Sequence, residues 1–454
     1  MATLKPYKKY NSVVYDYASE LPDGWQLLPN IAIFQERIER GHINEELLSV
    51  TIGKGVIKQT DVDIKKDSSN EDKSKYKLIK VGDIAYNKMR MWQGALGYSD
   101  YQGISSPAYV ILKPKMKISP RYFHYLFRTS FYTNYSKRFS YGIVDDQLSL
   151  RYTDFKRMYS IVPPLEVQNS IVAYLDKKNS QIDKFIRNKE RLIELLEERK
   201  STIINEAICG RIGYNNKNEK KIISYINGKE GEFEKSKFEW VGNTPKGWQY
   251  KKLPWVSKFQ EGPGLRTWQF TNEGIKVICV TNITEEGIDF SLLTRCISEK
   301  EYKKKYKHFT INKGDYLLAS SGASWGKVAE YIDDESVILN TSTIRFNSAN
   351  HQLYSKRFIK WAMKSRYMSE HLILLLTGSC QPNFGPSHLQ KLILNIPTID
   401  VQNSIVEFIE SELSEIHKSI KIINKEISSI KEYREALITD LVTGKRSVPK
   451  LQMN

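Results

Sequence analysis

The sequence predicts a mixed α/β protein. Two globular α/β domains are separated by two long helices that pair as an antiparallel coiled coil, and the halves form a pseudo-two-fold internal repeat. Three observations predict this class: a block of sequence that occurs twice, an apolar seven-residue period inside that block, and the length. At ~150 residues per folding unit, 454 residues suffice for about three units with buried cores.

The repeat is clearest in the segment VQNSIV, which occupies residues 167–172 and recurs at 401–406. The match runs without a gap through 163–210 and 397–444, with 15 identities in 48 positions. Shorter echoes keep the same order. They are PDGWQ at 22–26 against PKGWQ at 245–249, Gly82-Asp83 against Gly314-Asp315, and Ser119-x-Arg121-Tyr122 against Ser355-x-Arg357-Phe358. Such self-similarity indicates two copies of one structural unit.

The repeated block carries an apolar seam with a period of 3.5 residues over five heptads, which is typical of a coiled coil. Prolines precede each block and a glycine follows its last apolar residue, as expected at helix starts and stops. Packing of each helix on its own domain is the alternative interpretation. The residues expected to pair the helices are Leu175, Ile182, Ile186, Ile193, Leu196, Ile203, Ile409, Ile416, Ile420, Ile423, Ile427, Ile430 and Leu437.

These signals divide the chain into six segments. The segment 211–236 is rich in Lys, Asn, Glu and Gly, so it is expected to be a linker. The boundaries are a first globular domain 1–162, a first long helix 163–210, the linker 211–236, a second globular domain 237–396, a second long helix 397–446 and a C-terminal tail 447–454.

The charge points to a polyanionic partner. The net charge is +17, with a pI near 9.3, whereas the helical segments 176–206 and 407–435 together carry 13 basic against 14 acidic residues. The excess therefore lies in the globular parts, a distribution that favours globular modules meeting a polyanion such as nucleic acid; a basic surface without such a partner is the alternative interpretation.

Polar and aromatic residues gather in turn-prone stretches of both domains. Arg can bridge guanine and Gln or Asn can bridge adenine, while Lys, Ser and glycine-turn amides suit phosphates. A partly buried aromatic or a solvated cation is the ordinary alternative for each residue alone. The candidate DNA-contact residues are Lys88, Arg90, Trp92, Gln93, Tyr141, Gln147, Arg151, Arg266, Trp268, Gln269, Ser320, Ser321, Ser324, Trp325, Lys327, Gln381 and Asn383.

Other classes of function find little support in the sequence. No apolar run approaches the ~20 residues of a membrane span, and the N-terminus has no secretory pattern. The four cysteines form no C-x-x-C pair, which favours a reducing cytoplasm. The stretch Gly322 to Val328 resembles a phosphate loop, but its spacing is one residue short and Ser/Thr is missing after Lys327. We therefore predict no catalytic residues, no metal site and no cofactor on this chain.

The repeated Pro-x-x-x-Val-Gln-Asn-Ser-Ile-Val opening at 163 and 397, the helix after it and the P-x-G-W-Q segments at 22 and 245 resemble the DNA-specificity subunit of type I restriction–modification systems. The resemblance covers about residues 22–446. It implies that the globular domains are target-recognition domains, each reading one half of a split double-stranded DNA target, with a spacer set by helix length.

The resemblance also implies partners. These are two methyltransferase (modification) subunits that bind S-adenosylmethionine and, optionally, two restriction subunits that use ATP and Mg²⁺. Two alternatives stay open at this point: a DNA methyltransferase or nuclease with its own active site, and a coiled-coil assembly protein without DNA binding.

Overall fold

The computed structural model describes residues 4–15, 18–62, 73–142, 147–214, 220–221, 225–226, 229–230, 233–236, 243–376 and 383–449. The chain forms two compact units. The first is Met1–Lys189 with Asn424–Asn454, and the second is Glu190–Ile423. Each unit therefore contains one globular domain together with part of both long helices.

The first globular domain is built around a four-stranded antiparallel sheet with the strand order β4-β11-β8-β9. These strands are Phe34–Glu36, Tyr109–Pro114, Ile84–Asn87 and Leu96–Tyr98. Smaller antiparallel pairs surround the sheet: β1 (Tyr10–Tyr15) with β2 (Ala18–Pro22), β3 (Gln26–Pro29) with β12 (Tyr159–Val162), β5 (Leu48–Thr51) with β6 (Gly55–Lys58), and β7 (Lys77–Ile79) with β10 (Gly103–Ser105).

The helices of this domain supply an aromatic core. Phe34 from the sheet meets Phe123 and Phe127 with ring centroids 5.0 and 5.9 Å apart, and all three side chains are buried. The helical elements are α1 (Asn30–Ile33), η1 (Gln59–Asp61), η2 (Met91–Gln93), α2 (Pro120–Arg128), α3 (Ser130–Phe139) and α4 (Tyr152–Phe155).

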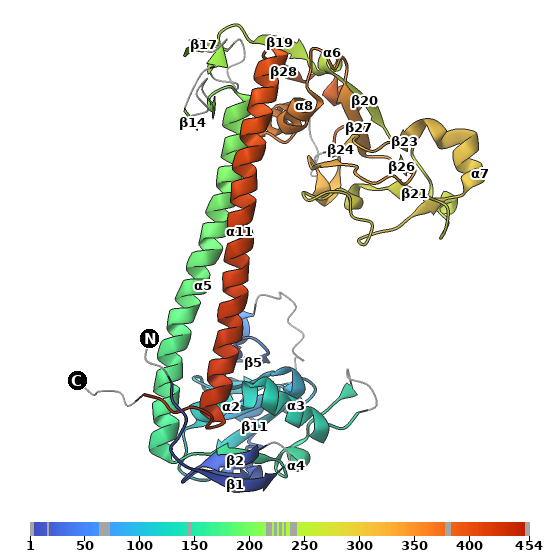
Figure 1. Ribbon diagram of the computed structural model, residues 1–454. Coiled ribbons are helices and arrows are strands. Elements are labelled where there is room, and N and C mark those ends of the chain that lie inside the picture. The colour runs from blue at the N-terminus through green and yellow to red at the C-terminus, as the bar shows by residue number, and fades with distance from the viewer. Residues whose placement is uncertain are drawn as a thin grey trace. The chain divides into compact units, whose positions relative to one another are not determined.

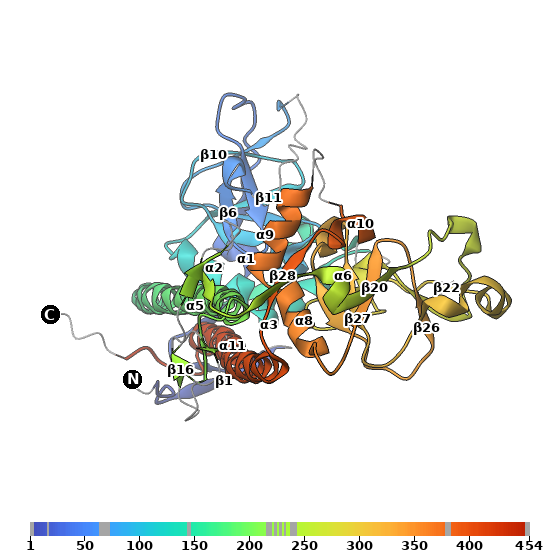
Figure 2. The ribbon, with the colours of Figure 1, turned by 90° about the horizontal axis from the view of Figure 1, so that it is seen from above.

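The second globular domain repeats this plan. Its main antiparallel sheet has the order β20-β27-β24-β25, and β19 (Gln249–Lys252) pairs with β28 (Ile393–Ile396) as β3 pairs with β12. The helices α8 and α9 accompany this sheet (Figure 2). The sheet strands are Ser257–Glu261, Thr343–Ser348, Tyr316–Ala319 and Val328–Glu330, and the helices are α6 (Leu253–Val256), α8 (Lys356–Met363), α9 (Arg366–Leu375) and α10 (Pro386–Leu389).

This domain also has a second sheet, with the order β22-β21-β26-β23, in which β21 and β26 run parallel. Its strands are Cys296–Ile297, Ile275–Ile278, Val337–Leu339 and Thr310–Ile311. The remaining short helical turns of this domain are η5 (Thr267–Gln269), which precedes β21, and η6 (Val280–Asn282), α7 (Glu299–Glu301), η7 (Tyr302–Tyr306) and η8 (Lys307–Phe309), which lie between strands of this sheet. A further turn, η9 (Gly322–Ser324), lies between β24 and β25 of the main sheet.

In the stretch expected to be a linker (211–236) and just after it, the described residues form short antiparallel pairs. They are β13 (Gly213–Tyr214) with β14 (Lys220–Lys221), β15 (Tyr225–Ile226) with β16 (Lys229–Glu230), and β17 (Phe233–Lys235) with β18 (Asn243–Pro245).

The long helices α5 (Leu165–Ile208) and α11 (Ile399–Val442) each span 44 residues and lie side by side (Figure 1). In the first unit Lys189 Nζ lies 2.6 Å from Glu426 Oε2, and Asp183 pairs with Arg434. In the second unit Arg199 lies 4.0 Å from Glu412. Because the partner number falls on α11 as the number rises on α5, the helices run antiparallel, as the sequence predicts.

Each globular domain is joined to its following helix by a buried glutamine of the VQNSIV repeat. Gln168 Oε1 accepts a hydrogen bond from Ser119 N at 2.8 Å, at the start of α2. Gln402 Oε1 accepts one from Ser355 N at 2.8 Å, at the start of α8. The two sequence echoes around these serines and glutamines therefore meet each other in both copies.

The PxGWQ echoes have a structural role at the other end of each helix. Gly210 ends α5 with φ +72°, and a Cβ there would lie 2.5 Å from Pro245 Cγ. Gly444 ends α11 with φ +78°, and a Cβ there would lie 2.6 Å from Pro22 Cγ. Each helix thus starts from one domain and ends against the PxGWQ segment of the other copy, so that glycine is needed at both stops.

Candidate nucleic-acid interface

In the first domain, the loop between β8 and β9 carries the first four candidate residues. The η2 turn within it ends at Gly94, whose φ of +84° suits glycine. Arg90 and Gln93 are exposed, whereas Lys88 and Trp92 are half-buried. The ammonium of Lys137, from α3, lies 4.9 Å from the Trp92 ring centroid, which orients this indole and adds a cation that the sequence did not single out.

A second loop of the same domain meets the first. Leu150 N donates a hydrogen bond to the carbonyl of Lys88 at 2.9 Å, which brings the neighbouring Arg151 to the β8–β9 loop. Burial lowers the pKa of Lys88, and the charges of Lys77 and Arg151 lower it further. Lys88, Arg90 and Arg151 therefore lie on two loops in contact, and this concentration of positive charge favours an anionic ligand.

The remaining candidates of this loop are exposed. Tyr141 pairs with Ser149 through the backbone and has a side chain that is 78% exposed. Gln147 and Arg151 are exposed as well. Residues 143–146, between them, lie outside the described residues.

The second domain brings together the corresponding loops. The loop between β24 and β25 again contains a short helical turn, η9, followed by a glycine, Gly326, with φ +78°. Phe384 N donates a hydrogen bond to the carbonyl of Ser320 at 3.2 Å. This pair is offset by 234 and 232 residues from Leu150 and Lys88. The two domains therefore use one loop–loop contact twice.

The side chains on the second pair of loops differ in kind. Ser320 and Ser324 are buried, and Ser320 Oγ donates to the carbonyl of Ser342 at 3.1 Å. Trp325 packs edge-on against Phe384 with ring centroids 5.6 Å apart. Ser321, Trp325 and Lys327 are half-buried and Asn383 is exposed, whereas Gln381 lies outside the described residues.

The candidates Arg266, Trp268 and Gln269 belong to a different part of the second domain, next to η7. Arg266 is exposed and Trp268 is 78% exposed. Gln269 is only 6% exposed and hydrogen-bonds Glu301 and Tyr306. In this structure Gln269 holds the loop and does not present its amide to solvent.

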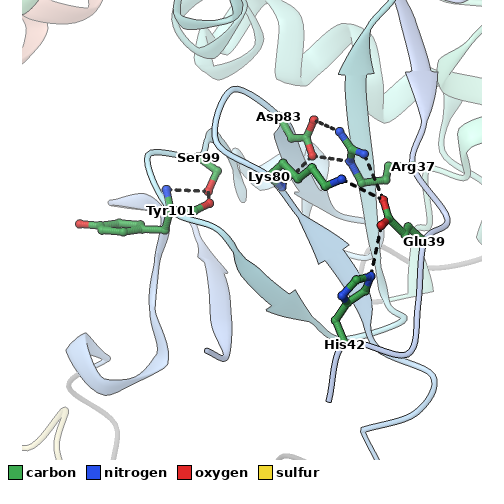
Figure 3. A network of polar contacts seen from close by, with 7 residues as sticks. All are labelled: Arg37, Glu39, His42, Lys80, Asp83, Ser99 and Tyr101. Carbon is green, nitrogen blue, oxygen red and sulfur yellow. Dashed lines mark hydrogen bonds and ion pairs between the residues drawn. The ribbon is translucent and has the colours of Figure 1, made fainter. Parts of the chain in front are cut away.

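The Gly-Asp echo supports the sheets of both domains. Asp83 accepts hydrogen bonds from Lys80 N at 2.9 Å and from Arg37 Nε at 2.7 Å (Figure 3). Asp315 accepts one from Asn312 N at 2.9 Å and lies 3.5 Å from Arg345. Each aspartate therefore closes the turn before a central strand and pairs with an arginine, which is Arg37 just after β4 in the first domain and Arg345 in β27 in the second.

None of the residues expected to pair the helices is exposed. Most are buried, and four are half-buried: Ile193, Leu196, Ile420 and Ile430. The buried ones are Leu175, Ile182, Ile186, Ile203, Ile409, Ile416, Ile423, Ile427 and Leu437.

No group of three or more His, Cys, Asp or Glu side chains within the described stretches of the chain is arranged to hold a metal ion. None of the helices there is both long enough and apolar enough to cross a membrane.

Comparison with known proteins gives a consistent result. Residues 245–431 match the family described as the type I restriction modification DNA specificity domain. The type I restriction enzyme MjaVIII specificity subunit of Methanocaldococcus jannaschii is 25% identical over 83% of this chain and 84% of its own length. The MjaIX specificity subunit of the same organism is 23% identical over 74% of this chain and 72% of its own length.

Two solved structures share the fold. One, from work on complex assembly and conformational transition of the type I R-M system, has a TM-score of 0.67 at 14% identity and covers 94% of this chain and 99% of its own. The HsdS subunit from Thermoanaerobacter tengcongensis has a TM-score of 0.53 at 14% identity, over 96% and 99%.

A duplicated α/β domain with an equivalent loop–loop contact in both copies defines a subunit with two equivalent surfaces. Residues 245–431 of this chain match the specificity-domain family of type I restriction–modification systems, and most of the chain is similar to specificity subunits of such systems. The predicted family and fold class are confirmed, and the comparisons support neither of the two alternatives. Because the relatives are specificity subunits, the prediction that this chain is the non-catalytic component is confirmed as well.

Proposed function

We propose that this chain reads a bipartite DNA target, with one half-site for each globular domain, and directs methyltransferase subunits to it. The observation that carries this proposal is the repeated loop contact. Lys88 with Leu150 and Ser320 with Phe384 join equivalent loops in the two domains. A reading surface that occurs twice in one chain fits two half-sites.

The side chains of these loops suit direct readout and phosphate contact. Arg90, Gln93 and Arg151 are exposed in the first domain, and Arg and Gln are the residues that bridge guanine and adenine in the major groove. The second domain offers Lys327, Trp325 and Asn383 in the equivalent place. Since the two sets differ, we expect the two half-sites to differ in sequence.

The partner subunits are expected to dock on the long helices. Large apolar side chains on these helices are exposed, although their paired faces are covered. Phe185 and Tyr433 are 39% and 44% exposed in the first unit, and Leu192, Leu195 and Ile422 are 40%, 45% and 60% exposed in the second. Exposed apolar side chains on a helix pair fit helices of a partner protein.

We propose two methyltransferase subunits, one for each half of the repeat, with restriction subunits as an optional addition. In this arrangement S-adenosylmethionine, ATP and Mg²⁺ bind to those partner subunits and not to this chain. A chain that reads cellular DNA works where the DNA is, so we place it in the cytoplasm.

The experiment that tests the proposal is co-expression with a methyltransferase subunit, followed by genome-wide mapping of methylated positions. We expect a two-part motif with a fixed gap. Replacing residues 24–162 with the corresponding domain of a relative should change one half of the motif and leave the other half and the gap intact. Replacing residues 247–396 is the matched control and should change only the other half. A swap that altered both halves, or neither, would contradict one half-site per domain.

A further inference from the structure

A surface of the second domain outside the two converging loops combines an exposed indole with a run of lysines. We call Arg266, Trp268, Lys304, Lys305 and Lys307 the lysine surface. Trp268 is 78% exposed, and the other four side chains are exposed as well. The lysines lie on η7, a π-helical turn, and at the start of η8. Turns of π-helix are rare and are frequently found at functional sites.

One buried side chain joins the two parts of this surface. Gln269 Oε1 accepts a hydrogen bond from Arg266 N at 2.8 Å, which closes the loop on itself. Gln269 Nε2 donates to Glu301 Oε1 at 2.6 Å and to Tyr306 Oη at 2.9 Å, at the two ends of the lysine turn. Leu265 packs in the same apolar cluster as Tyr302 and Tyr306. The Arg266–Trp268 loop and the lysine turn therefore form one ordered surface.

The lysines of this surface are available to an external anion. Lys303 is held by Glu299, with Nζ and Oε2 2.8 Å apart. In the part of the chain that the structure describes, no carboxylate forms an ion pair with Lys304, Lys305 or Lys307. Several like charges held side by side on a rigid turn repel one another, and an anion that binds across them relieves this repulsion.

The reading loops of the two domains differ in the charge they supply. In the first domain they carry Lys88, Arg90 and Arg151, whereas Lys327 is the one cation among the candidates on the second pair. Duplex DNA carries one negative charge per ~1.7 Å of axis, so a domain that docks on it needs several cations. In the second domain the lysine surface supplies them.

We propose that the lysine surface binds the phosphate backbone of duplex DNA and fixes the second domain on its half-site without reading bases. This inference rests on the proposed DNA-reading function and adds a second contact site to it. Lys304, Lys305 and Lys307 neutralise phosphates, and Gln269 keeps their turn ordered before DNA arrives.

The test measures how the affinity of the full chain, in complex with its methyltransferase subunits, depends on salt. The probe is a duplex that carries the mapped target. The variant is Lys304→Gln/Lys305→Gln/Lys307→Gln. Its matched control, Lys258→Gln/Lys313→Gln/Lys391→Gln, removes three exposed lysines elsewhere in the same domain. Each lost phosphate contact lowers the slope of log K against log salt by about 0.9, so the variant is expected to lose about 2.7 and the control close to nothing.

A second readout separates backbone contact from base reading. The variant should methylate the same two-part motif as the parent, only with weaker occupancy at high salt. An unchanged slope, an equal loss in the control, or a changed half-site would overturn the proposal. So would loss of methyltransferase subunits from the complex, because the surface would then bind protein. If the parent complex bound DNA without salt dependence, the proposed function itself would fail, which distinguishes the two outcomes.

Discussion

At the scale of single residues, the environment of a side chain decides its role more than its type does. His124 on α2 illustrates this. Its Nδ1 accepts a hydrogen bond from the backbone N–H of Tyr98 at 3.1 Å, so the imidazole is held in its neutral form. Burial, followed by the positive charges of Arg128 and Arg121, lowers the pKa of His124 from 6.5 to about 3.

This lowered pKa makes the stability of the first domain depend on pH. Between pH 6.5 and about 3 the unfolded chain binds a proton at His124 that the folded chain does not. The stabilisation is therefore fully present above pH 6.5 and is lost as the pH falls, by up to about 1.4 kcal/mol per pH unit. From pH 7.5 to pH 5.0 the parent should lose about 2 kcal/mol more than His124→Gln. Urea unfolding at the two pH values measures this, and equal losses in both proteins would contradict it.

The candidate residues of the second domain show where residue-level prediction stops. The sequence places Ser320, Ser324 and Gln269 in polar, turn-prone stretches, and the structure has all three buried. The orientation of the Ser320 and Gln269 side chains is set by hydrogen bonds to residues more than 20 positions away, namely the carbonyl of Ser342 and the side chain of Glu301. No local pattern encodes these contacts, whereas the location of the loops themselves follows from the turn signals.

At the scale of elements, each α2 or α8 helix is held on its long helix by the same set of contacts. Arg121 and Tyr125 both bind Asp176, with Arg121 Nη1 3.0 Å from Oδ2. In the second domain Arg357 and Trp361 bind Glu410, with the indole Nε1 3.1 Å from Oε1. The Ser-x-Arg echo therefore marks the start of α2 and of α8, where each helix contacts its long helix. Its partners on α5 and α11 could not be predicted, because the contacting residues lie about 50 positions away.

The buried glutamine at this junction gives an element-scale prediction. Gln402 accepts from Ser355 N and donates to the carbonyls of Leu353 and Pro397, at 2.8, 3.0 and 2.9 Å, with no exposed surface. Gln402→Leu leaves these backbone groups unpaired in the core, which should cost about 2–4 kcal/mol. Asn403→Leu, one position along and exposed, is the control and should change stability by less than about 0.5 kcal/mol. Denaturant unfolding of the full chain measures both, and equal midpoints would show that α8 does not depend on this junction.

At the scale of the whole molecule, the duplicated organisation could be predicted because the repeat and the heptad seam are local patterns. The helices Leu165–Ile208 and Ile399–Val442 fall within the repeated blocks. The compact units differ from the sequence segments, because each unit takes part of both helices: Lys189 and Asn424 mark the division. The two units share both helices because two segments more than 200 residues apart in the sequence pair with each other. No local stretch of the sequence predicts where the division between the units falls.

The shared helices lead to a prediction about the target. One heptad in each helix adds seven residues, or about 10.5 Å at 1.5 Å per residue. This matches about three base pairs at ~3.4 Å each. Duplicating 183–189 in α5 and 424–430 in α11 keeps the seam in register, so the mapped motif should keep both half-sites while its gap grows by about three base pairs. Duplication in α5 alone is the control and should abolish methylation, because the seam then loses its partner. An intact complex with an unchanged gap would show that helix length does not set the spacer, and the fixed gap would then have to come from the partner subunits.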